Sequence, residues 1–159
     1  MKASILSLLG VVLAFLLCVA AFSGTANAAS GDYFKSTAAL SWCAQENGSD
    51  RGVFLDPCSP TSGSDLWVTT VPQAGYIEIK NVHSGLCMTG ESSGTVDLTA
   101  CSANNQSQWW GVGTCNNNLG FIYFNQGQSG WLWQSVKSLQ TRSTLDPNSS
   151  HDCWAFYTP

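Results

Sequence analysis

Residues 101–110 read Cys-Ser-Ala-Asn-Asn-Gln-Ser-Gln-Trp-Trp and end in the tripeptide Gln108-Trp109-Trp110. Two related tripeptides, Asp65-Leu66-Trp67 and Asp152-Cys153-Trp154, place one tryptophan 43 residues before Trp110 and another 44 residues after it. Cys58 and Cys101 each precede their tryptophan by nine residues. A period of this size indicates an internal repeat. The chain is therefore predicted to contain three copies of one unit, at about residues 30–71, 72–115 and 116–159.

Other landmarks recur in the same order. The phrase Leu55-Asp56-Pro57-Cys58 returns as Leu145-Asp146-Pro147-Asn148. The stretch Ser84–Met88 likewise parallels Ser129–Trp133. On this alignment, the third copy has Leu132 and Asn148 where the earlier copies have cysteines, and it is shorter by three residues.

Short apolar stretches between Gly, Ser, Asn and Pro predict β-strands. In the second copy these are Tyr76–Lys80, Leu86–Thr89, Thr95–Leu98 and Trp109–Val112. Twelve such strands in three units bury little apolar surface singly, so they are expected to close around a pseudo-threefold axis, which also removes exposed edges. The predicted fold class is all-β, and one large aromatic side chain per unit is expected in the core: Trp67, Trp110 and Trp154.

The first part of the chain has the pattern of a secretory leader. Residues 5–22 are almost entirely apolar, and Ala26-Asn27-Ala28 fits the A-x-A cleavage pattern. We expect a signal peptide at residues 1–28 and one domain at residues 29–159. An uncleaved signal anchor is the alternative, because the apolar run approaches the length of a membrane span. Cleavage predicts a secreted, extracellular protein without a membrane span.

Charge and cysteine usage narrow the function classes. Charged residues make up 10% of the chain, and without Lys2 five basic residues oppose ten acidic ones, a net charge of −5. This sign disfavours nucleic acid as a partner. Six cysteines outside the leader fit an oxidised disulfide framework. The chain has no CxxC and only two histidines, so neither a metal site nor a cofactor is expected.

Taken together, the period of about 43 residues, the paired cysteines and the Gln-x-Trp motif resemble the ricin B-type β-trefoil lectins. The resemblance implies a disulfide-stabilised β-trefoil in which the tryptophans are buried and the polar residue two positions earlier anchors a loop. It also implies bonds within repeats, Cys43 with Cys58 and Cys87 with Cys101. Cys115 and Cys153 are then left to pair with each other, although six cysteines alone allow fifteen connectivities.

The same resemblance suggests where each repeat would hold a sugar. In that family the pocket uses an Asp two residues after the first Cys, an aromatic residue two before the second, and polar residues beside Gln-x-Trp. Here the first position is Gln45, Thr89 or Gln134, and the second is Asp56, Thr99 or Asp146, so galactose specificity is not carried over. The candidate carbohydrate-binding residues are Gln45, Asp56, Asp65, Gln108, Gln134, Asp146 and Asp152.

Three further tryptophans are candidate aromatic contacts: Trp109, Trp131 and Trp133. Strand alternation points Trp131 and Trp133 to one side and Leu132 to the other. Two interpretations stay open for this pair. Either it is an exposed contact surface, or it fills a core that lacks an intra-repeat disulfide.

These patterns favour a secreted, non-catalytic, carbohydrate-binding module with degenerate sugar pockets, whose partners are glycans or glycoconjugates. The alternative is a secreted β-trefoil that binds a protein target as an inhibitor, toxin-like subunit or effector. An enzyme is disfavoured, because the chain lacks the common hydrolase and phosphate-loop motifs. Carboxylate pairs such as Asp56 with Glu78, or Asp146 with Asp152, read more simply as turn formers. If the source is a eukaryote, three sequons predict glycosylation: Asn47, Asn105 and Asn148.

Overall fold

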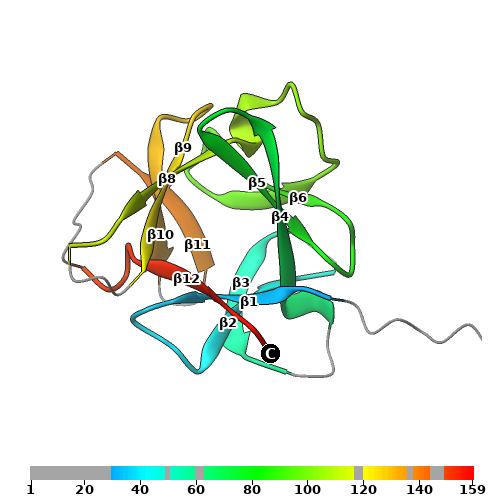
Figure 1. Cartoon of the computed structure of the whole chain (residues 1–159), viewed down its shortest axis with the longest axis vertical. Helices are drawn as coiled ribbons and strands as arrows, with labels where there is room; N and C mark the ends of the chain where they lie inside the picture. The colour runs from blue at the N-terminus through cyan, green and yellow to red at the C-terminus, as the bar shows by residue number, and fades with distance from the viewer. Residues whose placement is uncertain (1–29, 49–50, 60–62, 117–119, 136–137, 144–148) are drawn as a thin grey trace, which may run out of the picture.

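The computed structural model describes residues 30–48, 51–59, 63–116, 120–135, 138–143 and 149–159, and these form twelve strands and two 3₁₀ turns (Figure 1). The first repeat holds β1 (Asp32–Ser36), β2 (Trp42–Glu46), β3 (Val53–Pro57), η1 (Gly63–Asp65) and β4 (Leu66–Gln73). The second holds β5 (Tyr76–Asn81), β6 (Cys87–Gly90), β7 (Val96–Thr99), η2 (Gln106–Gln108) and β8 (Trp110–Thr114). The third holds β9 (Phe121–Asn125), β10 (Gly130–Ser135), β11 (Ser138–Arg142) and β12 (Trp154–Tyr157).

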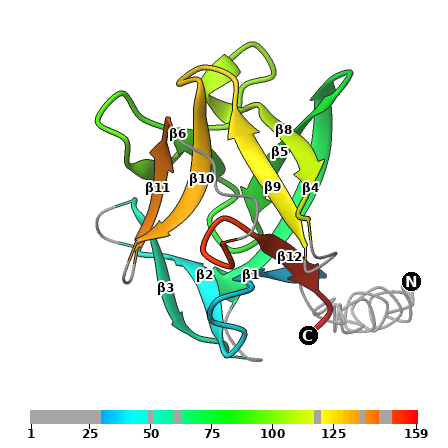
Figure 2. The ribbon, with the colours of Figure 1, turned by 90° about the vertical axis from the view of Figure 1, so that its left-hand side faces the viewer.

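Six of these strands close into a barrel. The antiparallel pairs run from β12 to β1, β4, β5, β8, β9 and back to β12. Figure 2 shows β4, β5, β8 and β9 side by side along one wall. Each repeat therefore contributes its first and last strand to the barrel, and no barrel strand is left with an open edge.

The other six strands form three hairpins that cap the barrel: β2 with β3, β6 with β7, and β10 with β11. Antiparallel backbone pairs join each hairpin to the next around the pseudo-threefold axis. Gly52 pairs with Asp97, Thr95 with Gln140, and Ser138 with Phe54. Each link leads from one repeat to the next, which gives the three lobes around the centre in Figure 1. This is the all-β, three-repeat trefoil predicted from the sequence.

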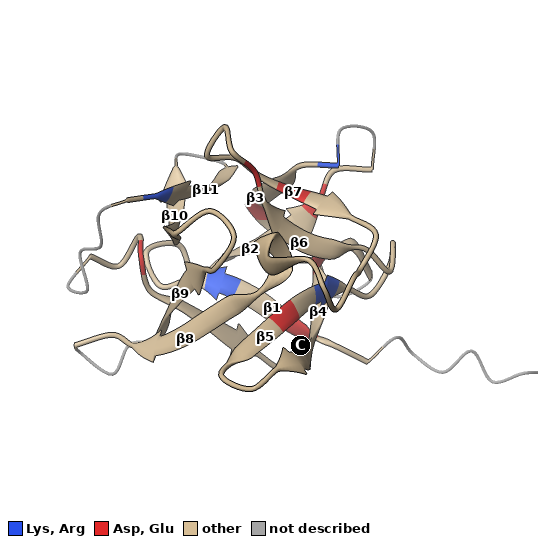
Figure 3. Cartoon of the chain, turned by 90° about the horizontal axis from the view of Figure 1, so that it is seen from above, with Lys and Arg blue, Asp and Glu red and all other residues tan. Residues whose placement is uncertain are grey.

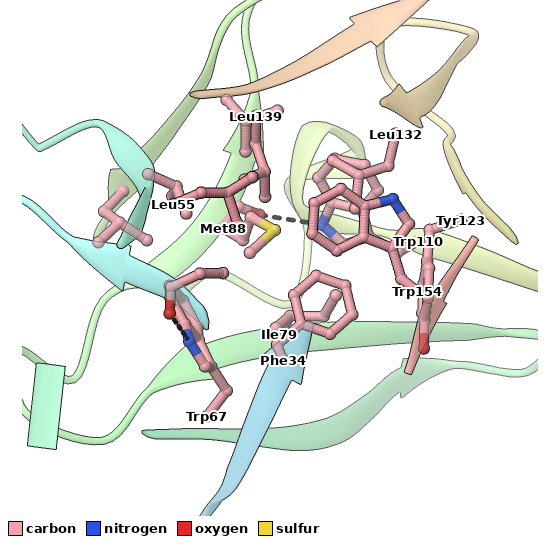
Figure 4. Close-up of a cluster of buried hydrophobic side chains, with 14 residues drawn as sticks. Phe34, Leu55, Trp67, Ile79, Met88, Trp110, Tyr123, Leu132, Leu139 and Trp154 are labelled. Carbon is pink, nitrogen blue, oxygen red and sulfur yellow. Dashed lines mark hydrogen bonds between the residues drawn. The ribbon is translucent and has the colours of Figure 1, made fainter. Parts of the chain in front are cut away.

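The core lies where barrel and cap meet. The three repeat tryptophans are at most 1% exposed, and Phe34 stacks on Trp154 with ring centroids 5.0 Å apart (Figure 4). The Nε1 atom of Trp67 donates to the carbonyl oxygen of Ala44 at 2.8 Å, and Nε1 of Trp110 donates to that of Met88 at 3.1 Å. Each of these two tryptophans thus ties a barrel strand to the cap hairpin of its own repeat.

Three disulfides are present, with the pairing expected from the resemblance. Cys43–Cys58 and Cys87–Cys101 each close a cap hairpin. The third bond, Cys115–Cys153, joins the end of the second repeat to the last strand region of the third. The third cap hairpin therefore has no disulfide of its own.

The strand register corrects the sequence alignment of the third repeat by one residue. Lys80 pairs with Cys87 across β5 and β6, and Phe124 pairs with Trp131 across β9 and β10. Lys80 and Phe124 each precede a fully buried asparagine, Asn81 or Asn125. Trp131, rather than Leu132, therefore occupies the place of Cys87. Leu132 is 1% exposed and occupies the core place of Met88.

The turns before these strands explain the misalignment. Gly85 has φ of 70° and Ser129 has φ of 51°, so both stand at the same left-handed turn position, four residues after the buried asparagine. The matching Ser-Gly letters of the two repeats are displaced by one residue, because serine takes the left-handed position in the third repeat. Alignment on Asn81 and Asn125 gives the correct register.

Candidate functional site

Three of the predicted sugar-binding residues are loop anchors. Asp65, Gln108 and Asp152 are all 0% exposed, so their assignment to a ligand site is wrong. Asp65 and Gln108 bond to the backbone ahead of their tryptophans, and Asp152 pairs with Arg142, as buried polar groups need partners. Asp65 accepts a hydrogen bond from the backbone N–H of Ser59 at 2.6 Å.

Gln108 shows most fully what the anchor does. Its Oε1 accepts from the backbone N–H of Ser102 at 2.8 Å. Its Nε2 donates to the hydroxyl oxygens of Thr89 and Thr99 and to the carbonyl oxygen of Ala100. Thr89 and Thr99, the second repeat's candidate pocket positions, are thus engaged in internal hydrogen bonds. Thr89 is 3% exposed, which leaves the second repeat without an accessible pocket at this place.

The first repeat does bring its predicted residues together. A hollow of about 360 Å³ is lined by cap-hairpin residues that include Gln45 and Asp56. The complete lining is Gln45, Glu46, Asn47, Phe54, Leu55 and Asp56. Gln45 donates through Nε2 to the carbonyl oxygen of Pro57 at 3.0 Å, which holds its amide across the two strands.

An aromatic ring at this hollow was missed from the sequence. Phe54 lies directly opposite Gln45 in the β2–β3 register, and it is 37% exposed. Its ring lies over Gly52, where a Cβ atom would come within 2.9 Å of the ring. The ring stands two residues before the expected aromatic position, so the motif comparison passed over it. The sequence signal for this ring is strand alternation: Val53 and Leu55 are buried, so Phe54 between them faces outward.

One wall of this hollow is tied to the second repeat. Glu46 has a 7% exposed side chain, and its Oε1 lies 2.5 Å from Nδ1 of His83 in the β5–β6 loop. The contact is charge-assisted when His83 is protonated. It holds the end of β2 against the neighbouring repeat.

In the third repeat the structure does not bring the predicted pocket residues together at one described site. Gln134 is 7% exposed and points inward beside Leu139, so it is not available to a ligand. Asp146, like Asn148, lies outside the described residues. The place of Gln45 is taken by Trp133, which pairs with Gln140 just as Gln45 pairs with Phe54.

Arg142 organises the outer face of this third hairpin. Its Nη2 donates to Oδ2 of Asp152, and its guanidinium carbon lies 5.0 Å from the centroid of the Trp133 ring. The Asp152 carboxylate therefore anchors its loop through a cation, whereas Gln108 uses neutral hydrogen bonds. Nothing in the sequence spacing singled out Arg142, because its partner lies ten residues away along the chain.

The remaining tryptophans resolve the two open interpretations differently. Trp131 packs against the Cys115–Cys153 disulfide and against Phe124, whose ring centroid is 4.8 Å away. It thus fills the space of the missing intra-repeat disulfide. Trp133, on the same face of β10, is partly exposed and lies beside the Arg142 guanidinium instead of the disulfide. Trp109 is also half-buried, and its ring lies 5.8 Å from that of Tyr76.

Few of the described residues are charged, as the colouring of Figure 3 shows. Among the described residues there is no group of three or more His, Cys, Asp or Glu that would hold a metal ion. Glu78 lies on barrel strand β5 and accepts from the Thr70 hydroxyl at 3.0 Å, while Asp56 lies on a cap hairpin. No helix in the described part of the chain is long and apolar enough to cross a bilayer.

The surroundings of two tyrosine side chains raise the pKa of their hydroxyls. Burial raises the pKa of Tyr123 far above its ordinary value. Burial and, to a smaller extent, the charge of Asp65 also raise the pKa of Tyr33. In both cases the neutral hydroxyl is favoured in the folded protein.

Comparison with known proteins gives two findings at the level of sequence. The family described as "Cytolethal distending toxin A/C domain" matches residues 59–122, which is less than half of the chain. No curated protein sequence matches the chain.

Solved structures show the fold clearly. An endo-β-galactosidase from Clostridium perfringens that releases GlcNAcα1-4Gal superposes with a TM-score of 0.72 at 11% identity, over 82% of this chain and 33% of that one. The Polyporus squamosus lectin, bound to a sialylated epitope, gives a TM-score of 0.67 at 13% identity, over 80% of this chain and 48% of that one. This chain thus spans a third and about half of those two proteins.

A third structure extends the likeness to a toxin. The Haemophilus ducreyi cytolethal distending toxin superposes with a TM-score of 0.67 at 10% identity, over 80% of this chain and 83% of that one. At these identities the likeness establishes the β-trefoil fold. The chain is therefore similar in fold to lectin and toxin β-trefoils, and its middle segment is similar in sequence to a toxin A/C domain.

Proposed function

We propose that this chain is a secreted, non-catalytic lectin-like module that binds a glycan in the hollow of the first repeat. In this proposal residues 1–28 are removed as a signal peptide and residues 29–159 form the working domain, of the ricin B type. The observation that carries the proposal is the meeting of the Phe54 ring with the Gln45 amide and the Asp56 carboxylate at one hollow.

The chemistry of the hollow suits a sugar. A sugar ring has an apolar face that stacks on an aromatic side chain, and hydroxyls that donate to carboxylates and bond to amides. Phe54 supplies the ring, while Asp56 and Asn47 supply polar groups at the rim. Asp56 is exposed, so its carboxylate is hydrated until a ligand displaces the water.

A second candidate function is a protein-binding subunit of a toxin-like assembly. The match of residues 59–122 to the toxin A/C domain favours it. The two functions are compatible on one chain, because all the residues that line the first-repeat hollow lie outside the matched segment.

The test compares surface variants on a glycan array, with the mature chain purified and its disulfides intact. Phe54→Ala and Asp56→Asn are each expected to weaken the strongest glycan signal about tenfold or more, since each removes one contact type. Phe121→Ala is the matched control, because this ring is 43% exposed on barrel strand β9.

A signal that survives both Phe54→Ala and Asp56→Asn would reject the first-repeat site. A blank array from folded protein would reject glycan binding and leave the toxin-subunit function as the one to pursue. In that event, capture of a secreted partner from the source organism becomes the decisive measurement.

A further inference from the structure

A second hollow lies between the second and third repeats, away from the first-repeat site. Its volume is about 170 Å³. One wall is the turn between β6 and β7, and the other is formed by the turn between β9 and β10 together with the end of β11. The lining residues are Glu91, Ser92, Gly94, Gln128, Ser129, Gly130, Thr141, Arg142 and Ser143.

One backbone hydrogen bond joins the two walls, and a second closes the β6–β7 turn. The N–H of Thr141 donates to the carbonyl oxygen of Gly94 at 2.8 Å, and the N–H of Gly94 donates to that of Glu91 at 2.9 Å. Gly94 has φ of 83°, and a Cβ atom there would lie 3.4 Å from the Thr141 carbonyl oxygen. The left-handed backbone of this turn therefore favours glycine, and the hydrogen bond from Thr141 holds the two repeats together beside the hollow.

The third-repeat wall is held in place by side chains as well. Gln128 donates through Nε2 to the Ser107 hydroxyl at 3.2 Å, and its backbone N–H donates to Oδ1 of the buried Asn125 at 2.9 Å. Arg142 is held between Asp152 and the Trp133 ring. Its guanidinium is thus oriented before any ligand arrives, which lowers the entropic cost of binding.

Glu91 and Arg142 line this hollow without pairing with each other, and the Arg142 guanidinium already pairs with the buried Asp152 carboxylate. Glu91 comes from the second repeat and Arg142 from the third, and no ion pair joins them within the described part of the chain. An anionic ligand would meet the Glu91 carboxylate, and a cationic ligand would meet the Arg142 guanidinium. A neutral ligand rich in hydroxyl groups satisfies both, because hydroxyls donate to a carboxylate and accept from a guanidinium.

We infer that this inter-repeat hollow binds a single neutral sugar ring, as a second subsite for the glycan that the proposed function assigns to the chain. Its volume of about 170 Å³ corresponds to about six water molecules, which is room for one sugar ring. The Ser92, Ser129 and Ser143 hydroxyls and the Gln128 amide add partners that both donate and accept. A second subsite on one rigid domain would raise affinity for a branched or multivalent glycan.

The test is an amide NMR titration of the mature chain with simple methyl glycosides. The probes are the methyl glycosides of glucose, galactose, mannose and N-acetylglucosamine, at millimolar concentration. The reporters are the amides of Gly94 and Gly130 and the side-chain amide of Gln128. At least one glycoside is expected to move these signals along a saturable curve.

Two variants on the second-repeat turn locate the site without touching the core. Glu91→Gln keeps the shape but removes the charge, and it is expected to weaken the saturable binding about tenfold. Ser92→Trp places an exposed ring at the mouth and is expected to abolish it. Ser93→Trp is the matched control on the same turn, because Ser93 does not line the hollow.

Three results would overturn the inference. They are the absence of any saturable shift at these amides, shifts that persist unchanged in Ser92→Trp, and saturation by free glycine but by none of the glycosides. The last result would assign the hollow to a zwitterion instead. The amides of Gln45 and Asn47 report separately on the first-repeat site, so loss of one set of shifts with retention of the other shows which of the two proposals failed.

Discussion

The second and third repeats share one backbone pattern and differ in the chemistry that secures it. In the second, the Cys87–Cys101 disulfide closes the cap hairpin and Gln108 anchors the following loop through neutral hydrogen bonds. In the third, Trp131 occupies the disulfide's place, and Asp152 anchors the loop through Arg142. The fold thus tolerates a covalent or an aromatic closure, and a neutral or an ionic anchor.

The difference has a consequence for function. The second repeat uses its polar groups internally, so Thr89 and Thr99 are engaged with Gln108. The ionic anchor of the third repeat instead places a guanidinium on the outer face, beside Trp133 and the inter-repeat hollow. The least regular repeat is therefore the one in which the partner of the anchor, Arg142, also lines a candidate ligand site.

The largest expected effect on stability comes from removing the loop anchors Asp152 and Gln108. Asp152→Ala leaves the Arg142 guanidinium without its carboxylate partner and is expected to lower the free energy of unfolding by about 3–5 kcal/mol. Gln108→Ala breaks neutral hydrogen bonds and is expected to cost about 1–3 kcal/mol. Urea unfolding of both variants with disulfides intact measures the difference. Equal losses would show that the ionic anchor is no more sensitive than the neutral one.

The next largest effect is expected from removing the groups that close the cap hairpins, the Cys87–Cys101 disulfide and the Trp131 ring. Removal of the second repeat's bond by Cys87→Ala with Cys101→Ala opens a loop with a sequence separation of 14 residues and is expected to cost about 3 kcal/mol. Trp131→Ala removes a half-buried ring from the Cys115–Cys153 disulfide and is expected to cost about 2 kcal/mol. Thermal unfolding under oxidising conditions compares the two. Trp131→Phe, which retains a ring, should recover part of the loss.

The loss of stability at alkaline pH distinguishes the contributions of Tyr123 and Tyr33. Because burial raises the folded-state pKa of Tyr123, the unfolded chain loses its proton first as the pH rises past about 10. The stability is complete below this pH and falls above it by up to about 1.4 kcal/mol per pH unit. Tyr123→Phe should flatten this fall more than Tyr33→Phe does, since Tyr123 is 2% exposed and Tyr33 is 7% exposed. Unfolding midpoints from pH 8 to 11 provide the check; an unchanged slope in Tyr123→Phe would contradict the assignment.

The smallest expected difference concerns the core tryptophans. Trp110→Phe leaves the Met88 carbonyl oxygen without its donor, whereas among the described residues the Trp154 Nε1 atom has no hydrogen-bond partner to lose. Trp110→Phe is therefore expected to be more destabilising than Trp154→Phe by about 1 kcal/mol. Chemical denaturation of the two variants measures this directly. A more damaging Trp154→Phe would indicate that ring packing outweighs the hydrogen bond.

Much of the fold was predictable from a few residues. Trp67, Trp110 and Trp154 recur at one period, and a unit of that length buries its apolar residues only with its neighbours. The two intra-repeat disulfides followed from the resemblance. The candidate site was less accessible. Gln45 and Asp56 were predicted and do meet at a hollow, but Phe54 was missed because its ring stands two residues from the expected position.

The third repeat shows why the rest was not predictable. Its Ser-Gly letters match those of the second repeat one residue out of register. Because side chains alternate across a strand, a slip of one residue exchanges the inner and outer faces. The sequence alignment therefore placed Gln134 in a pocket, whereas the structure buries Gln134 and leaves Trp133 partly exposed on the opposite face of β10.

The sequence by itself determined the threefold repeat, the all-β class, the buried tryptophans and the oxidised cysteine framework, because these depend on composition and on spacing along the chain. Only the tertiary structure decided which face each third-repeat side chain occupies, that Arg142 binds Asp152, and that Glu91 and Arg142 line one hollow. Those features depend on cross-strand register and on contacts between repeats. Both arise when the barrel closes, and neither is set by the distance between residues along the chain.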